Sequence, residues 1–248
     1  MWPISRIVGR VAVVCACVFL AQAVALAQRV DQVARVFPPA PVRPLDIRIA
    51  AGSVEIRGED RPDISVVVER PGGRVAPEVI DETAERILVD ATRPAAASAE
   101  APVKVVVRAP RATPVHFVHV GVGDVSLLAW RGTVQVKVEQ GAITADDVSG
   151  VVRLETGSGD ITVRQATLPR DGLLRCRTLT GHVRVSLSEV PQDARVLLMT
   201  MAGSVRSDLP VADKEGFGGR LKEGTLGNGQ PLLSLDAVRG DLTVTVGR

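Results

Sequence analysis

The stretch from Gly123 to Thr167 reads GDVSLLAWR GTVQVKVEQ GAITADDVS GVVRLETGS GDITVRQAT, five consecutive blocks of nine residues that each begin with glycine. Apolar or small residues recur at every second position, which is the period of a β-strand with one buried face, whereas a helix repeats at about 3.6. The first, third and fifth blocks resemble one another, so the structural repeat is eighteen residues, two short strands and two bends. The pattern predicts a parallel β-solenoid with one coil per repeat.

The same register continues towards the C-terminus. Gly181, Gly203 and Gly240 head the strands GHVRVSL, GSVRSDL and GDLTVTV, and another apolar alternation begins nine residues before each glycine. Only the spacing after the glycine-headed strands varies, so the extra residues fall at one corner of the coil and are expected to stack along one edge. These insertions are Leu168–Asp171, Val190–Asp193 and Ala212–Gln230.

Stacked coils predict columns of inward-facing residues that form the core. One column is Val134, Val152, Leu174, Val196 and Leu233, a second is Val125, Ile143, Ile161, Val183, Val205 and Leu242, and a third is Val136, Leu154, Cys176, Leu198 and Leu235. Cys176 is interpreted as a buried apolar filler and not as a reactive thiol. Thr156, Thr178 and Thr200 occupy one position in consecutive coils and are expected to stabilise a corner by methyl packing and hydroxyl hydrogen bonds.

The N-terminal residues 1–27 have the features of a Sec signal peptide. Arg6 and Arg10 form a basic start, an apolar run follows, and Ala25-Leu26-Ala27 matches a cleavage site. A retained membrane anchor is the alternative, although the run is short for a span of about 20 residues. Residues 28–44 are then a linker or N-terminal cap, rich in proline, and residues 45–248 form a single β-solenoid domain.

Composition restricts the class of protein. The chain has 30 Lys and Arg and 28 Asp and Glu, and because the expected signal carries two of the arginines and no acid, the remainder is neutral overall. Nothing in this balance indicates a nucleic-acid partner. Two of the three cysteines lie in the expected signal, so no intramolecular disulfide is available to Cys176.

Between Asp63 and Val122 the strands are clear but the nine-residue register is not. DISVVVER, ERILVDA, VKVVVRAP and PVHFVHVGV are β-rich runs separated by polar or Ala/Pro segments. We expect irregular coils or hairpins that join the regular stack.

Several motifs resemble those of a family of bacterial secreted, adhesin-like domains, many known only as domains of unknown function. They are DIRIAAGSVEI at Asp46–Ile56, VKVVVRAP at Val103–Pro110, VHVGVGDVSL at Val118–Leu127 and the repeats of the ETGSGDITV type. The resemblance covers roughly Leu45 to the C-terminus. It implies a β-solenoid in the cell envelope, in the periplasm, at the surface or secreted, and brings no catalytic residues with it.

No pattern of catalytic or metal-binding residues stands out. Gly157-Ser158-Gly159-Asp160 approaches the repeat of calcium-binding β-rolls, but the positions after the repeat glycines hold too few aspartates to coordinate an ion in successive coils. Arg239-Gly240-Asp241 spells an RGD tripeptide whose glycine the coil itself requires. We therefore expect no enzymatic activity, no metal and no cofactor; the alternatives are a polysaccharide-modifying enzyme and a self-assembling scaffold joined end to end through its exposed strand edges.

Two groups of residues are candidates for binding an envelope or extracellular ligand, either a protein or an anionic glycan. The first lies in the longest insertion, which is expected to fold over Leu197 and Met199 on the outside of a neighbouring strand, and consists of Phe217, Arg220, Leu221 and Lys222. The second is the outward column of Arg153, Arg175 and Arg177, with Arg164, Arg184 and Arg206 expected to line the other strand of the coil.

Overall fold

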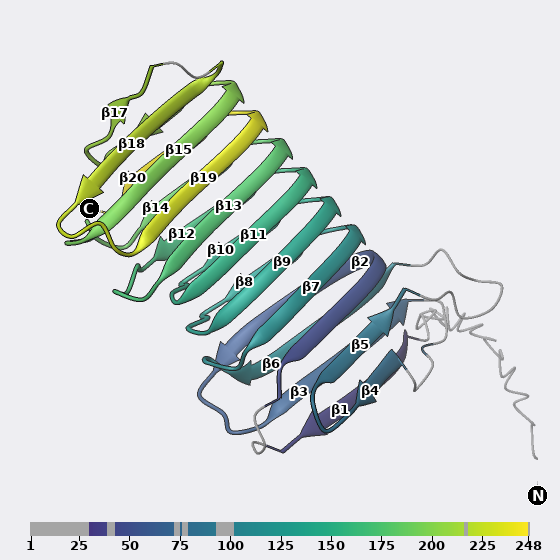
Figure 1. Ribbon diagram of the computed structural model, residues 1–248. Coiled ribbons are helices and arrows are strands. Elements are labelled where there is room, and N and C mark those ends of the chain that lie inside the picture. Colours follow the sequence, from purple (N-terminus) through teal and green to yellow (C-terminus); the bar gives the residue numbers. More distant parts are fainter. Residues whose placement is uncertain are drawn as a thin grey trace, which may run out of the picture.

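The computed structural model describes residues 30–38, 43–71, 75, 79–92, 102–215 and 218–247. Within these ranges the chain forms 20 β-strands and no α-helix (Figure 1). Among the described residues, none belongs to a helix long and apolar enough to span a membrane. The expected signal peptide lies outside these ranges. The all-β prediction is confirmed.

Six strand pairs form the regular coils, which Figure 1 shows stacked side by side. They are β7 (Val115–Val122) with β8 (Val125–Leu128), β9 (Thr133–Gln140) with β10 (Ile143–Asp146), β11 (Val151–Ser158) with β12 (Ile161–Ala166), β13 (Leu173–Thr180) with β14 (Val183–Leu187), β15 (Ala194–Ala202) with β16 (Val205–Ser207), and β19 (Leu232–Arg239) with β20 (Leu242–Val246).

The two members of each pair belong to two different parallel sheets. The odd-numbered strands of these coils form the first sheet and the even-numbered strands form the second. Val152 lies in register between Val134 and Leu174, as the inward column predicted. The residues of all three predicted columns are buried and make up the core between the sheets.

The order of the coils differs from the order of the sequence at the C-terminal end. β19 pairs with β13 on one side and β15 on the other, and β20 pairs with β14 and β16. Leu242 therefore lies between Val183 and Val205. The prediction that these coils stack in sequence order is wrong, because every coil carries the same register and the last one fits between two earlier ones.

The N-terminal end is also intercalated. β2 (Leu45–Glu59) is a whole coil in one long strand, whose first half pairs with β5 (Ile87–Ala91) and β7 in the first sheet. Its second half pairs with β6 (Val103–Pro110) and β8 in the second sheet. The coil that includes β6 thus lies on one side of β2, and β7–β8 lie on the other.

Antiparallel strands complete this end, as the expectation of hairpins predicted. β3 (Ile64–Pro71) pairs with β6 and with β1 (Val30–Phe37), and β4 (Ile80–Glu82) pairs with β5. Residues 30–37, which the sequence suggested as part of a linker or cap, form the edge strand of the second sheet. Val36 of this strand is 64% exposed, whereas Phe37 at its end is buried in the core.

The longest insertion adds a strand at the C-terminal edge of the first sheet. β18 (Arg220–Leu226) runs antiparallel to β15, and β17 (Ala212–Asp213) pairs with β18. Leu221 lies opposite Met199 in this pairing. The expectation that the insertion folds over the outer face of Leu197 and Met199 is wrong, since residues 220–226 continue the sheet and cover its open edge instead.

A column of glycines forms the tight corner between the two strands of each coil. Gly159 and Gly181 have φ of 149° and 148°, a region that residues with a side chain rarely adopt. A Cβ atom on Gly181 would lie 2.0 Å from the carbonyl oxygen of Gly159. Gly240 lies similarly close to Gly181, and Gly203 lies similarly close to Gly240. The glycine of the last coil thus lies between those of the two coils that precede it in the chain.

Threonine hydroxyls connect the corners of neighbouring coils. The hydroxyl of Thr178 donates a hydrogen bond of 3.1 Å to the carbonyl oxygen of Gly159. Thr156 and Thr178 are neighbours, but Ala237 of the intercalated strand separates Thr178 from Thr200. The predicted threonine column is therefore interrupted, and its hydroxyls bind glycine carbonyls.

Candidate functional site

An open hollow of about 190 Å³ lies on the outer face of the first sheet, over β9, β11 and β13. Arg153 and Arg175 are in-register neighbours on parallel strands, and Arg177 follows two residues later on the same face. Gln135 and Glu155 also line the hollow. The alternation that turns Leu154 and Cys176 inward turns these side chains outward, and the structure brings the three arginines together. We call this the arginine hollow.

The arginine hollow carries unbalanced positive charge. Its three guanidinium groups are exposed, and none forms a hydrogen bond or ion pair with another residue in the part of the chain that the structure describes. Arg153 and Arg175 stand on strands about 4.8 Å apart, where like charges directly opposite each other are destabilising. Glu155, level with Arg177, is the only carboxylate in the lining. A guanidinium group binds carboxylate or phosphate through two parallel hydrogen bonds, so an anion fits this hollow.

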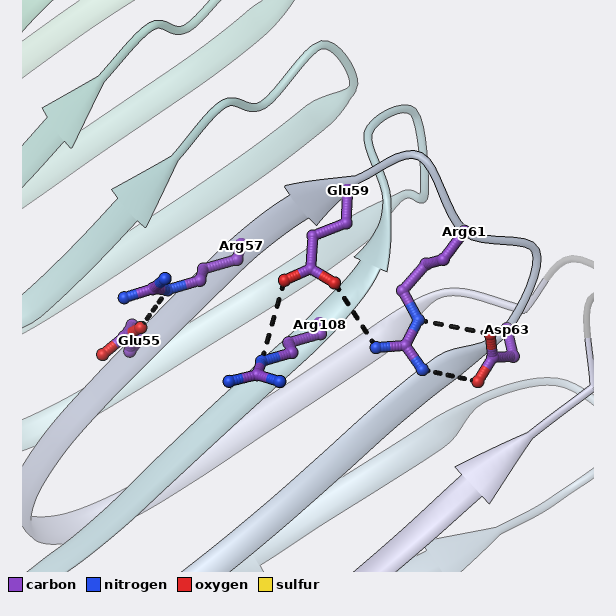
Figure 2. A network of polar contacts seen from close by, with 6 residues as sticks. All are labelled: Glu55, Arg57, Glu59, Arg61, Asp63 and Arg108. Carbon is purple, nitrogen blue, oxygen red and sulfur yellow. Dashed lines mark hydrogen bonds and ion pairs between the residues drawn. The ribbon is translucent and has the colours of Figure 1, made fainter.

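The second sheet shows the opposite arrangement near β2 and β6. There the hydrogen bonds from Arg61 lower the pKa of Asp63. Figure 2 shows the network, in which every guanidinium group meets a carboxylate: Arg57 contacts Glu55, Arg108 contacts Glu59 at 3.7 Å, and Arg61 contacts Asp63 at 2.6 Å and Glu59 at 3.5 Å. These arginines are neutralised within the fold, in contrast to those of the arginine hollow.

The predicted arginine column of the second sheet is not one level row. Arg184 lies level with Thr162 and Thr243, whereas Arg164 lies two residues after Thr162, within the register irregularity between Val163 and Ala166. Arg184 also forms an ion pair of 3.0 Å with Asp160. This face therefore does not gather free guanidinium groups as the first sheet does.

The three insertions converge at one corner, as predicted. Residues of Leu168–Asp171 and Val190–Asp193 line a hollow of about 300 Å³ together with Gln230 and Pro231. Its charged groups include one arginine, Arg170, and two acids, and the Asp193 carboxylate accepts a hydrogen bond of 2.8 Å from the backbone of Asn228. The hollow at the insertion corner thus has one more acidic than basic group and no cluster of positive charge.

The other candidate residues lie apart from the arginine hollow. Arg220, Leu221 and Lys222 are on β18, and β19 and β15 separate that strand from β13. Lys222 contacts Asp213 at 3.4 Å. Phe217 lies outside the described residues.

Aspartates that follow corner glycines have a structural role. Each carboxylate accepts a hydrogen bond from a backbone N–H of the neighbouring coil in space. This structural role explains why an aspartate follows Gly240 in the RGD tripeptide. The pairs are Asp124 with Ala142 at 2.8 Å, Asp160 with His182 at 2.8 Å and Asp241 with Ser204 at 2.7 Å. In the described ranges, no group of three or more His, Cys, Asp or Glu residues is placed to hold a metal ion.

The histidine rings lie beside carboxylates: His182 is 3.5 Å from Asp241, whose carboxylate also accepts a hydrogen bond of 2.8 Å from the Ser204 hydroxyl. Cys176 is buried, and this burial raises the pKa of its thiol far above the usual range. His116 contacts the buried Asp46 at 3.2 Å, and His119 contacts Glu139 at 3.2 Å. Among the described residues, no serine or cysteine side chain hydrogen-bonds to a histidine ring.

Comparison with a solved structure supports the fold. A "putative cell adhesion protein" from Clostridium sporogenes is similar over 88% of this chain and 100% of its own, with a TM-score of 0.50 and 9% identity. A "putative adhesin" from Bacteroides fragilis is similar over 88% of this chain and 97% of its own, with a TM-score of 0.35 and 11% identity. A search of curated proteins found no match.

Residues 118–245, more than half of the chain, match the family described as Toastrack DUF4097. The match begins within β7 and includes the regular coils, the glycine corners and the intercalated last coil. It confirms the predicted resemblance to adhesin-like domains of unknown function. The chain belongs to the Toastrack DUF4097 family.

Proposed function

We propose that this protein is a non-catalytic binding module of the bacterial cell envelope, and that the arginine hollow binds an anionic envelope polymer. The observation that carries this proposal is the set of three unpaired guanidinium groups of Arg153, Arg175 and Arg177 on one flat face. The arginines near β2 and β6 contrast with these, since Arg57, Arg61 and Arg108 each contact a carboxylate in Figure 2.

The rest of the molecule supports a binding role and not turnover. The thiol of Cys176 is buried, and in the described part of the chain no histidine ring hydrogen-bonds to a serine or cysteine side chain as the base of a nucleophile. The expected signal peptide in residues 1–27 supports export to the periplasm, the surface or the medium. A stack of parallel strands is a suitable support for a binding face, since it holds the backbone of Arg153, Arg175 and Arg177 at the spacing of the strands.

The proposal is tested by binding of poly(glycerol phosphate), a soluble polyanion, to the exported form of the protein. Wild type is expected to bind with an affinity that falls as salt increases, because exposed charges are screened. The triple variant Arg153→Gln, Arg175→Gln, Arg177→Gln is expected to lose at least ~10-fold in affinity, since each lost charge-assisted hydrogen bond contributes about 1.5 to 3 kcal/mol.

A matched control replaces two exposed arginines of the second sheet, Arg164→Gln and Arg206→Gln, and is expected to leave binding within about twofold of wild type because surface charges outside the site contribute little. Equal losses in both variants would refute a localised site. Hydrolysis of any polysaccharide in a parallel turnover screen would refute the non-catalytic role.

A further inference from the structure

An exposed apolar row lies beside the arginine hollow on the same face. Leu179, Val238 and Met201 are 47%, 42% and 49% exposed. Their neighbours Thr178, Ala237 and Thr200 are in register, so the three side chains stand next to one another on β13, β19 and β15. We call this row the apolar shelf.

The apolar shelf is continuous with further apolar surface. Met199 lies two residues before Met201 on the same face of β15 and is half-buried, and Leu221 of β18 lies opposite Met199. The six large hydrophobic side chains that are exposed in the described part of the chain include all three shelf residues. Single exposed apolar residues are normal on a protein surface, whereas contiguous ones mark a binding surface.

The shelf and the hollow share a border on β13. Arg177 and Leu179 are two residues apart, so their Cα atoms are about 6.6 Å apart along the strand. Asp236 lies between Arg177 and Met199 across the strands. An apolar chain that avoids this carboxylate therefore follows the row of Leu179 and Val238 towards Met201.

We propose that this face binds a phosphate-bearing lipid, with its head group in the arginine hollow and its acyl chain on the apolar shelf. This inference rests on the proposed function and specifies the ligand as lipid-linked. Charge complementarity favours this occupant, since a free guanidinium cluster matches a phosphate and the adjoining surface matches a hydrocarbon chain. A second copy of this chain packed face to face would bring the same unpaired arginines and is not complementary.

The test compares three probes by calorimetry below the micelle concentration: lysophosphatidylglycerol, glycerol phosphate as the head group alone, and an uncharged alkyl maltoside as the chain alone. Wild type is expected to bind the lysolipid at least ~10-fold more tightly than either part, because each buried methylene adds to affinity. The double variant Leu179→Ser, Met201→Ser is expected to lose most of this gain while glycerol phosphate binding stays unchanged.

Val122→Ser is the matched control, since Val122 is 54% exposed but lies on β7, away from the shelf. The lipid inference is overturned if wild type binds lysolipid and glycerol phosphate with equal affinity. It is also overturned if Val122→Ser loses as much lysolipid affinity as the shelf variant. The proposed function stands in either case. Lysolipid binding only above the micelle concentration overturns it as well. If the triple arginine variant retains full binding of poly(glycerol phosphate), the proposed function fails, and the lipid inference fails with it.

Discussion

Thr200 donates a hydrogen bond from its hydroxyl to the carbonyl oxygen of Gly240 at 2.9 Å, across 40 residues of sequence. Thr178 makes the equivalent bond to Gly159, which belongs to the preceding coil in the chain. The difference shows that the β15–β16 coil rests on the last coil and not on the β13–β14 coil. Residues 231–247 thus fill a position that would otherwise leave strand edges unpaired on both sides.

Truncation of the chain after Gln230 is expected to release β15 and β16 from the stack. Without β19 and β20, the inner edges of β13 and β15 lose their hydrogen-bonding partners. Hydrogen exchange should show loss of amide protection in both strands, and a synthetic peptide of residues 231–247 should restore it. Full protection in the truncated protein would mean that β15 closes directly onto β13.

Gly181→Ala is expected to lower the free energy of unfolding by about 3 kcal/mol or more, because the residue has φ of 148° and its new Cβ would lie 2.0 Å from the Gly159 carbonyl oxygen. Chemical denaturation measures the change. Gly218→Ala is the control, since the nearest atom to an added Cβ there is the Met201 methyl group at 4.0 Å. Similar destabilisation by both would contradict the corner geometry.

Leu242→Asp and Thr243→Asp place the same carboxylate on opposite faces of β20. Leu242 is buried, so an unpaired charge there is expected to cost more than about 4 kcal/mol and to unfold much of the protein. Thr243 lies outward between Arg184 and Arg206, where the change is expected to stay within about 0.5 kcal/mol. Thermal unfolding followed by circular dichroism distinguishes the two, and equal damage would show that the register is wrong.

Replacing Ala212–Gln230 with a four-residue loop is expected to keep the coils but expose the edge of β15, which β18 covers along its length. An uncovered strand edge pairs readily with another chain. Light scattering at increasing concentration should therefore show association, while the β-sheet circular dichroism is retained. A variant that stays monomeric would show that β18 does not protect this edge.

Stability is expected to fall at acidic pH through the aspartates of the glycine corners. The backbone N–H of Ser204 lowers the pKa of Asp241. Because the folded-state pKa lies below the unfolded value of about 3.9, the contribution is complete above about pH 5 and is lost as the pH falls through the folded value. Melting temperatures from pH 7 to pH 2 should show a smaller decrease for Asp241→Asn than for the exposed control Asp171→Asn. Identical profiles would contradict this role.

The sequence predicted the coils well because inward and outward positions differ in chemistry at every second residue. The column of Val134 and Val152, the glycine corners and the outward position of Arg153 and Arg175 all follow from this alternation. The order of the coils could not be predicted, because Leu233 and Val196 fit equally well beside Leu174. Edge strands were missed for a different reason. β18 has no fully buried side chain, and β1 buries Phe37 but leaves Val36 exposed, so their sequences lack the alternation that reveals inner strands.

The same limit applies to the binding face. The arginine hollow could be found from the sequence, since Arg153 and Arg175 belong to consecutive coils that stack in order. The apolar shelf could not, because Val238 and Met201 become neighbours of Leu179 only through the intercalated coil. The alternation predicts that Leu179, Val238 and Met201 each face outward, but it does not predict that they are neighbours.

The intercalated coil also constrains how the protein is made. A ribosome delivers β15 and β16 before β19 and β20, so the stack cannot be completed progressively as the chain emerges. β15 and β16 remain unattached to the finished coils until residues 231–247 have been synthesised. A product terminated before residue 231 lacks this closing element, which leaves open strands for proteases and chaperones to recognise.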